Sequence, residues 1–77
     1  MTEDEIFEAA DKIEAVLSDT PMTPSAIGRK VKMTTGAVGR VLAWMVRENY
    51  VIAVGNGGWT KYRTRQFGET NRFRLDR

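Results

Sequence analysis

The sequence predicts an α+β fold in which three helices precede a C-terminal β-hairpin, and two patterns point to this class. Apolar residues recur at helical spacing in three consecutive segments, and each segment follows a threonine that can cap a helix. After the third segment the period changes to short β-branched and aromatic runs on either side of a glycine-rich tetrapeptide. A chain of 77 residues accommodates one such domain. Domains of this size bury only roughly 60% of their unfolded surface, so the margin of stability is small.

The first helix is predicted from Glu3 to Leu17. From Ile6 onward, apolar side chains recur three or four residues apart and give the helix one apolar face. Thr2 and Glu5 have the spacing of a capping box, and the acidic residues of the first turns favour the positive end of the helix dipole.

Two further helices are predicted. Pro21 ends the first helix, because proline lacks an amide donor and disfavours helical angles in the residue before it. The second helix is predicted over residues 24–31, with Thr23 as its N-cap and a proline at its first position. The third is predicted over residues 34–48 and ends at Asn49, because asparagine tolerates the left-handed conformation of C-terminal caps.

A β-hairpin is predicted after the third helix. Residues 51–54 are apolar and mostly β-branched, and residues 55–58, Gly-Asn-Gly-Gly, have the composition of a turn. The second strand is predicted from Trp59 to Arg63. Trp59 and Tyr62 are three positions apart, so both face inward only if a bulge or a twist intervenes.

Residues 1–65 are predicted to form the domain, and residues 66–77 a basic C-terminal tail of uncertain order. Three apolar side chains lie among the basic residues of this tail, Phe67, Phe73 and Leu75. The pattern is compatible with a further short strand, an interface segment or a loose arm.

The net charge of +2 hides an uneven distribution along the chain. Residues 1–19 carry one lysine against seven acidic residues, a net charge of −6. Residues 20–60 carry five basic residues against one acidic residue, and residues 61–77 carry six against two, so each of these segments has a net charge of +4. An acidic first helix followed by a basic remainder predicts one face that repels polyanions and another that attracts them.

The composition argues against several classes of function. The chain has no cysteine and no histidine, which excludes disulfides and thiolate metal sites and removes the commonest zinc ligand and general base. We therefore expect no metal, no cofactor and no enzymatic activity, since neither Ser18 nor Ser25 has a histidine to activate it. An acidic N-terminus and the lack of a long apolar run predict a cytoplasmic protein that does not enter a membrane.

The stretch from residue 27 to residue 55, IGRKVKMTTGAVGRVLAWMVRENYVIAVG, resembles the helix-turn-helix and wing entry of winged helix-turn-helix transcription regulators. The resemblance is to the small bacterial or phage type, similar in size to the regulators of fimbrial operons. The matching positions are Val31, Thr34, Val38, Leu42 and Met45. The chain departs from the family pattern at Gly36 and Gly39, where such regulators often carry polar residues, and at Asn49, where the family has glycine.

The resemblance implies a nucleoid-associated regulator that binds double-stranded DNA with a recognition helix over residues 34–48 in the major groove. The wing over residues 51–63 would lie on the backbone or in the minor groove. The implied base-facing residues are Thr34, Thr35, Gly36, Ala37 and Arg40. The implied phosphate contacts are Arg29, Lys30, Lys32, Lys61, Arg63 and Arg65, and the implied wing tip is Asn56 and Gly57. Arg40 is the strongest candidate for reading a base, because arginine donates two hydrogen bonds to guanine.

Three alternatives remain open at this point. Gly36 and Gly39 either let the helix backbone approach DNA, or reflect tolerated weakness or close packing on the second helix. Trp44 either packs at the core under the first helix or the hairpin, or forms a contact in a homodimer. The chain could also be a winged-helix protein-interaction module without DNA binding, using the acidic first helix, Trp44 or the tail.

Overall fold

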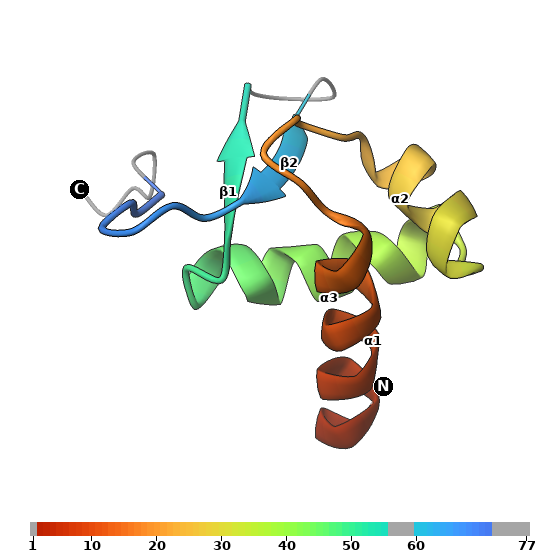
Figure 1. Cartoon of the computed structure of the whole chain (residues 1–77). Helices are drawn as coiled ribbons and strands as arrows, with labels where there is room; N and C mark the ends of the chain where they lie inside the picture. Colours follow the sequence, from red (N-terminus) through yellow and green to blue (C-terminus); the bar gives the residue numbers. More distant parts are fainter. Residues whose placement is uncertain (1, 56–59, 72–77) are drawn as a thin grey trace.

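The computed structural model describes residues 2–55 and 60–71 of the chain. Three helices precede a two-stranded antiparallel sheet (Figure 1), and this α+β layout is consistent with a winged helix with a C-terminal hairpin. The elements are α1 (Glu3–Val16), α2 (Pro24–Val31), α3 (Thr35–Arg47), β1 (Val51–Val54) and β2 (Lys61–Thr64). No helix in these described ranges is long and apolar enough to cross a membrane.

Each helix begins at the threonine that the sequence predicts. Thr2, Thr23 and Thr34 are N-caps in extended conformation, and each hydroxyl oxygen accepts a hydrogen bond of 3.2 Å from the backbone N–H three residues later. The Glu5 carboxylate accepts in turn from the backbone N–H of Thr2 at 2.8 Å, which completes the predicted capping box. Asn49 has a φ of 60°, which confirms the left-handed residue expected after α3.

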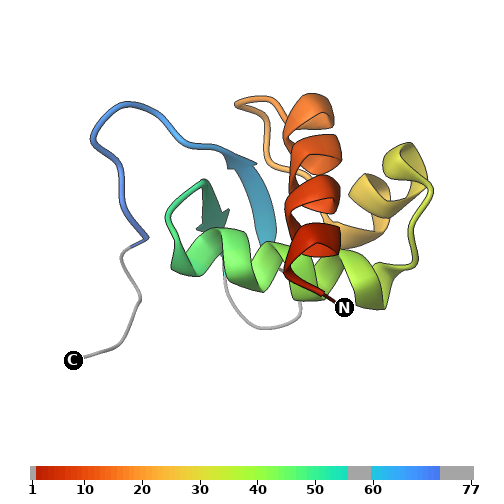
Figure 2. The ribbon, with the colours of Figure 1, turned by 90° about the horizontal axis from the view of Figure 1, so that it is seen from below.

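The core forms against one face of α3. Both α1 and the sheet pack toward the buried side of α3, and α2 lies at its N-terminal end (Figures 1 and 2). The side chains with no exposed surface or nearly none are Ile13, Ile27, Val38, Val41, Leu42, Met45 and Val51. Since every helix and β1 contribute to this cluster, the position of α3 is determined by packing against the whole domain.

Gly28 makes the tight turn between α2 and α3 possible. A Cβ atom at Gly28 would lie 2.7 Å from the carbonyl oxygen of Met33, a distance that real Cβ contacts essentially never show. The backbone N–H of Met33 donates to the Gly28 carbonyl at 2.9 Å, and Lys32 adopts a left-handed φ of 60°. Only glycine therefore allows this close approach of the backbone at the start of α3.

The second strand lies further along the chain than the sequence predicts. It covers residues 61–64 instead of 59–63, because Val51 pairs with Thr64 and Val54 with Lys61 across the hairpin. In this register Tyr62 packs partly buried against the core. Trp59, whose facing the sequence left open, lies outside the described residues.

The loop between α1 and α2 also pairs with β2, which the sequence did not indicate. Met22 and Tyr62 exchange two backbone hydrogen bonds of 2.8 Å, and the N–H of Thr64 donates to the Ser18 carbonyl at 2.9 Å. α1 ends at Val16 with Leu17 as its C-cap, ahead of Pro21, and the loop that follows bonds to the outer edge of β2.

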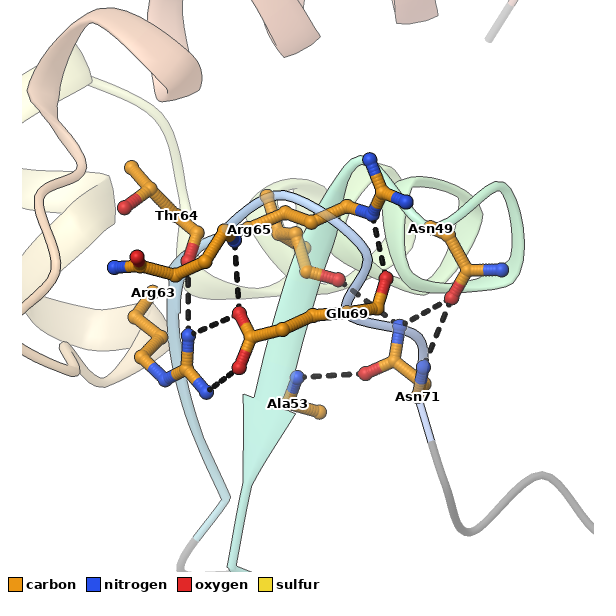
Figure 3. Close-up of polar contacts among 9 residues, drawn as sticks. Asn49, Ala53, Arg63, Thr64, Arg65, Glu69 and Asn71 are labelled. Atoms are coloured by element: carbon orange, nitrogen blue, oxygen red, sulfur yellow. Dashed lines mark hydrogen bonds and ion pairs between the residues drawn. The ribbon is translucent and has the colours of Figure 1, made fainter.

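Residues 65–71 return to the end of α3, where Asn71 is the one buried polar side chain of the described residues. Its amide nitrogen donates to the carbonyls of Val46 and Val51 and to the side chain of Asn49, each at 3.0 Å. Figure 3 shows the contact with Asn49. The amide oxygen of Asn71 accepts from the backbone N–H of Ala53 at 2.8 Å. Asn71 therefore joins the C-terminal end of α3 to β1.

Candidate nucleic-acid interface

One long face of α3 is exposed while the opposite face is fully buried. At about 100° per residue, positions 36, 40, 43 and 47 lie on one face and positions 38, 41, 42 and 45 on the other. The exposed positions carry Gly36, Arg40, Ala43 and Arg47. All four are exposed, and in Figure 2 the other described elements lie toward one side of α3. We call these four residues the open face of α3.

The structure leaves most of the predicted base-facing residues accessible. Thr34, Thr35, Gly36 and Arg40 are exposed, and Ala37 is half-buried. The Thr34 oxygen accepts the capping hydrogen bond, so its hydroxyl hydrogen is still available to donate. Arg40 and Thr34 lie at the N-terminal part of α3, which is the part of a recognition helix that meets base edges in this architecture.

The two glycines of α3 are not required for internal packing. Apart from the neighbouring backbone of α3 itself, a Cβ atom at Gly36 or at Gly39 would have no described atom within 4 Å. Close packing against α2 is therefore excluded as the reason for these glycines. Two interpretations remain, namely tolerated weakness of the helix and close approach of an external surface.

The basic residues around the turn between α2 and α3 are exposed as a group. Arg29 and Lys30 lie in the last turn of α2, and Lys32 is its C-cap. Among the described residues, the single ion pair joins Arg63 to Glu69, so none of these three cations is paired with a described carboxylate. Their charges lie beside the N-terminal end of α3 and are available to an external anion.

The basic residues of the hairpin divide into two groups. Lys61 is exposed at the start of β2. Arg63 instead makes two hydrogen bonds of 2.8 Å to the two carboxylate oxygens of Glu69, and Arg65 Nε donates to the Glu69 backbone carbonyl at 2.6 Å (Figure 3). Both arginines were predicted as phosphate contacts, and the structure brings them to the C-terminal loop.

These contacts strongly lower the pKa of the Glu69 carboxyl group. Hydrogen bonds from the Arg63 guanidinium and then from the Gln66 backbone N–H lower the pKa of Glu69 from 4.5 to about 2. The hydrogen bond with Glu69 likewise raises the pKa of Arg63. Glu69 is six residues from Arg63 in an irregular loop, so no periodic pattern in the sequence indicates that they meet.

Trp44 lies between two other aromatic rings. Its ring centroid is 5.4 Å from that of Phe7 on α1 and 5.3 Å from that of Tyr50 after α3. Trp44 is half-buried at the margin of the core, whereas Phe7 and Tyr50 are 46% and 50% exposed. Packing under the first helix, one of the two interpretations of Trp44, is thus observed, and a role in a homodimer stays a prediction.

Some residues of the open face were not among the predicted site residues. Arg47 and Ala43 follow Arg40 at intervals of three and four, and this spacing is the signal that would have included them. The predicted wing tip, Asn56 and Gly57, lies outside the described residues.

Comparison of the chain with models of protein families, with curated proteins and with solved structures finds no match.

Proposed function

We propose that the chain is a transcription regulator of bacterial or phage type that binds double-stranded DNA through α3. The observation that carries the proposal is the open face of α3, which presents Arg40 and Arg47 while the opposite face of the same helix is fully buried. Packing of the buried face fixes the helix backbone, so that the exposed positions point in one direction from a rigid element, as base recognition requires.

The dimensions of α3 suit the major groove. Its 13 residues give a length of about 20 Å, and the B-DNA major groove is about 12 Å wide. We assign Arg40 to a guanine edge, where two hydrogen bonds discriminate against other bases by roughly 1–3 kcal/mol. Gly36 and Gly39 lack side chains that would hold the helix backbone away from the DNA surface.

The charge distribution orients the domain in this proposal. Arg29, Lys30 and Lys32 are exposed beside the N-terminal end of α3 and contact phosphates, whereas α1 begins with three acidic residues and turns away from the duplex. Lys61 adds a phosphate contact from the hairpin. Arg63 and Arg65 contribute less than Lys61, because Glu69 already holds them.

Titration with a random-sequence duplex at low and moderate salt tests the proposal. Neutralising about five phosphates gives a slope of log affinity against log salt near −4 to −5. Absence of binding at low salt would contradict the proposal and would favour the protein-interaction module. In the DNA-binding case the protein associates with the nucleoid in the cytoplasm.

Two substitutions separate base contacts from phosphate contacts. Arg40→Ala is expected to weaken binding chiefly at one base-pair position of a selected site, by about 1–3 kcal/mol, whereas Lys32→Ala weakens all sequences alike. Lys12→Ala is the matched control, since it removes one positive charge from the exposed surface of α1. Fluorescence anisotropy with specific and random duplexes measures the affinities. If Arg40→Ala loses the same affinity for both duplexes, Arg40 does not recognise a base.

A further inference from the structure

A shallow groove lies between α1 and the C-terminal half of α3, away from the open face of α3. It has a volume of about 240 Å³, and Phe7, Trp44 and Tyr50 supply its aromatic surface. Asp11 and Glu14 of α1 also line it. We call this feature the aromatic groove, and the proposed DNA interface uses none of its residues.

The aromatic groove presents apolar surface that nothing in the described structure covers. Phe7 and Tyr50 are about half exposed, and both belong to the row of rings centred on Trp44. Contiguous aromatic surface of this kind on a small domain generally marks a contact site. The question is which segment occupies it.

The charges around the groove indicate which kind of peptide segment can bind there. Asp11 and Glu14 are exposed acidic residues, and no basic residue lines the groove among the described residues. A second copy that presents the same face would bring acidic residues against acidic residues, which is unfavourable. The groove instead fits a segment that combines apolar side chains with arginine or lysine.

We propose that the chain's own residues 72–77 occupy the aromatic groove. Their sequence, Arg-Phe-Arg-Leu-Asp-Arg, alternates basic and apolar residues and has a net charge of +2. In an extended segment Phe73 and Leu75 point to the same side, so both side chains can enter the groove while the arginines approach Asp11 and Glu14. These six residues lie outside the described part of the chain.

The end of the described chain lies within reach of the groove. The backbone N–H of Asn71 donates to the Asn49 side chain at 3.0 Å, and Asn49 immediately precedes Tyr50. Successive ring centroids from Tyr50 through Trp44 to Phe7 are 5.3 and 5.4 Å apart. Six extended residues span up to about 20 Å, which is longer than this row of rings.

Attachment at Asn71 makes the docking intramolecular. A short tether gives an effective concentration in the millimolar range, so the same peptide added in trans should bind only weakly. Docking covers the exposed rings and keeps the three tail arginines on the acidic side of the domain. The inference is independent of the proposed DNA binding, because it involves no residue of the open face.

The fluorescence of Trp44 reports on the groove directly. The chain has two tryptophans, so Trp59→Phe leaves Trp44 as the single reporter. In this background the full chain is compared with the full-length double variant Phe73→Ser, Leu75→Ser. We expect the double variant to show red-shifted Trp44 emission and a larger acrylamide quenching constant. A peptide of residues 71–77 in the millimolar range should reverse both changes.

A second pair of variants tests the charge argument. Asp11→Asn combined with Glu14→Gln should also increase the quenching of Trp44, whereas Glu8→Gln, an exposed acid that does not line the groove, should not. Unchanged Trp44 fluorescence in the tail variant or in the Asp11, Glu14 variant overturns the proposal. A change that depends on protein concentration overturns it in favour of a second copy. Loss of duplex binding without a change at Trp44 overturns it in favour of a tail that contacts DNA.

Discussion

Asn71 contributes more polar contacts than any other described side chain. It is 5% exposed, and its amide group bonds to the carbonyls of Val46 and Val51 and to the backbone N–H of Ala53, and so joins α3 to β1. We expect Asn71→Ala to lower the free energy of unfolding by about 2–3 kcal/mol, because the backbone groups of Val51 and Ala53 lose the hydrogen bonds that Asn71 makes to them. Urea denaturation measures the loss. Thr70→Ala, at the exposed neighbouring residue, is the control, and similar stability for the two variants would contradict this role of Asn71.

The glycines differ in what a methyl group would meet, and this gives opposite predictions. Gly28→Ala should destabilise the domain by about 1–3 kcal/mol, because the added Cβ atom meets the Met33 carbonyl. Gly36→Ala should stabilise it by about 0.5–1 kcal/mol, because the added Cβ atom meets open space and alanine favours a helix. Thermal unfolding of both variants provides the measurement. A change of the same sign in both would contradict the close approach at the turn.

The ion pair of Glu69 predicts a specific dependence of stability on pH. The folded-state pKa of Glu69 is lowered to about 2, so its contribution is present above pH 4.5 and is lost as the pH falls toward 2. Between those values the Tm of the natural sequence should fall more steeply than the Tm of Glu69→Gln, which no longer titrates at this position. Parallel curves for the two proteins would show that the pair contributes nothing measurable.

Within α3, the stability of the helix and its affinity for DNA place opposite requirements on the same glycines if α3 binds DNA. Gly36 and Gly39 weaken the helix, and both face open space. The proposed function predicts that Gly36→Ala and Gly39→Ala raise the Tm and at the same time lower the affinity for a duplex. Ala43→Ser, on the same open face, is the matched control because it adds a small group without filling a glycine position. Unchanged affinity together with higher stability would mean that the glycines are merely tolerated.

The helices could be predicted from the sequence because their signals are local. Thr2, Thr23 and Thr34 each bond to the backbone three residues later, and the buried faces follow the helical period within one segment. The register of β2 and the pairing of Met22 with Tyr62 involve residues far apart in the chain. No local pattern specifies such pairs, which is why the predicted second strand included Thr60 and missed Thr64.

The candidate site was predictable to the extent that it lies on a helix. The exposure of Thr34, Thr35 and Arg40 follows from the helical period once the buried face is known. The partners of Arg63 and Arg65 could not be predicted, because Glu69 reaches them through an irregular loop that Asn71 holds in place. The sequence therefore shows that Arg63 and Arg65 are basic, but it does not indicate that both are hydrogen-bonded to Glu69.

In the molecule as a whole, different faces of the domain differ in charge and in apolar surface. The open face of α3 and the turn before it are basic, the first turn of α1 is acidic, and the aromatic groove lies between α1 and the C-terminal half of α3. A duplex and a basic peptide segment should therefore bind to different faces of the domain. Such a separation would let the groove be covered without obstructing α3.

An amide NMR titration of the full chain with short duplex DNA shows whether the open face of α3 is the surface that meets a duplex. The largest shift changes are expected from Gly28 to Arg40 and at Arg47, with little change along α1. Largest changes in α1 or around Trp44, with α3 unaffected, would contradict binding through the open face.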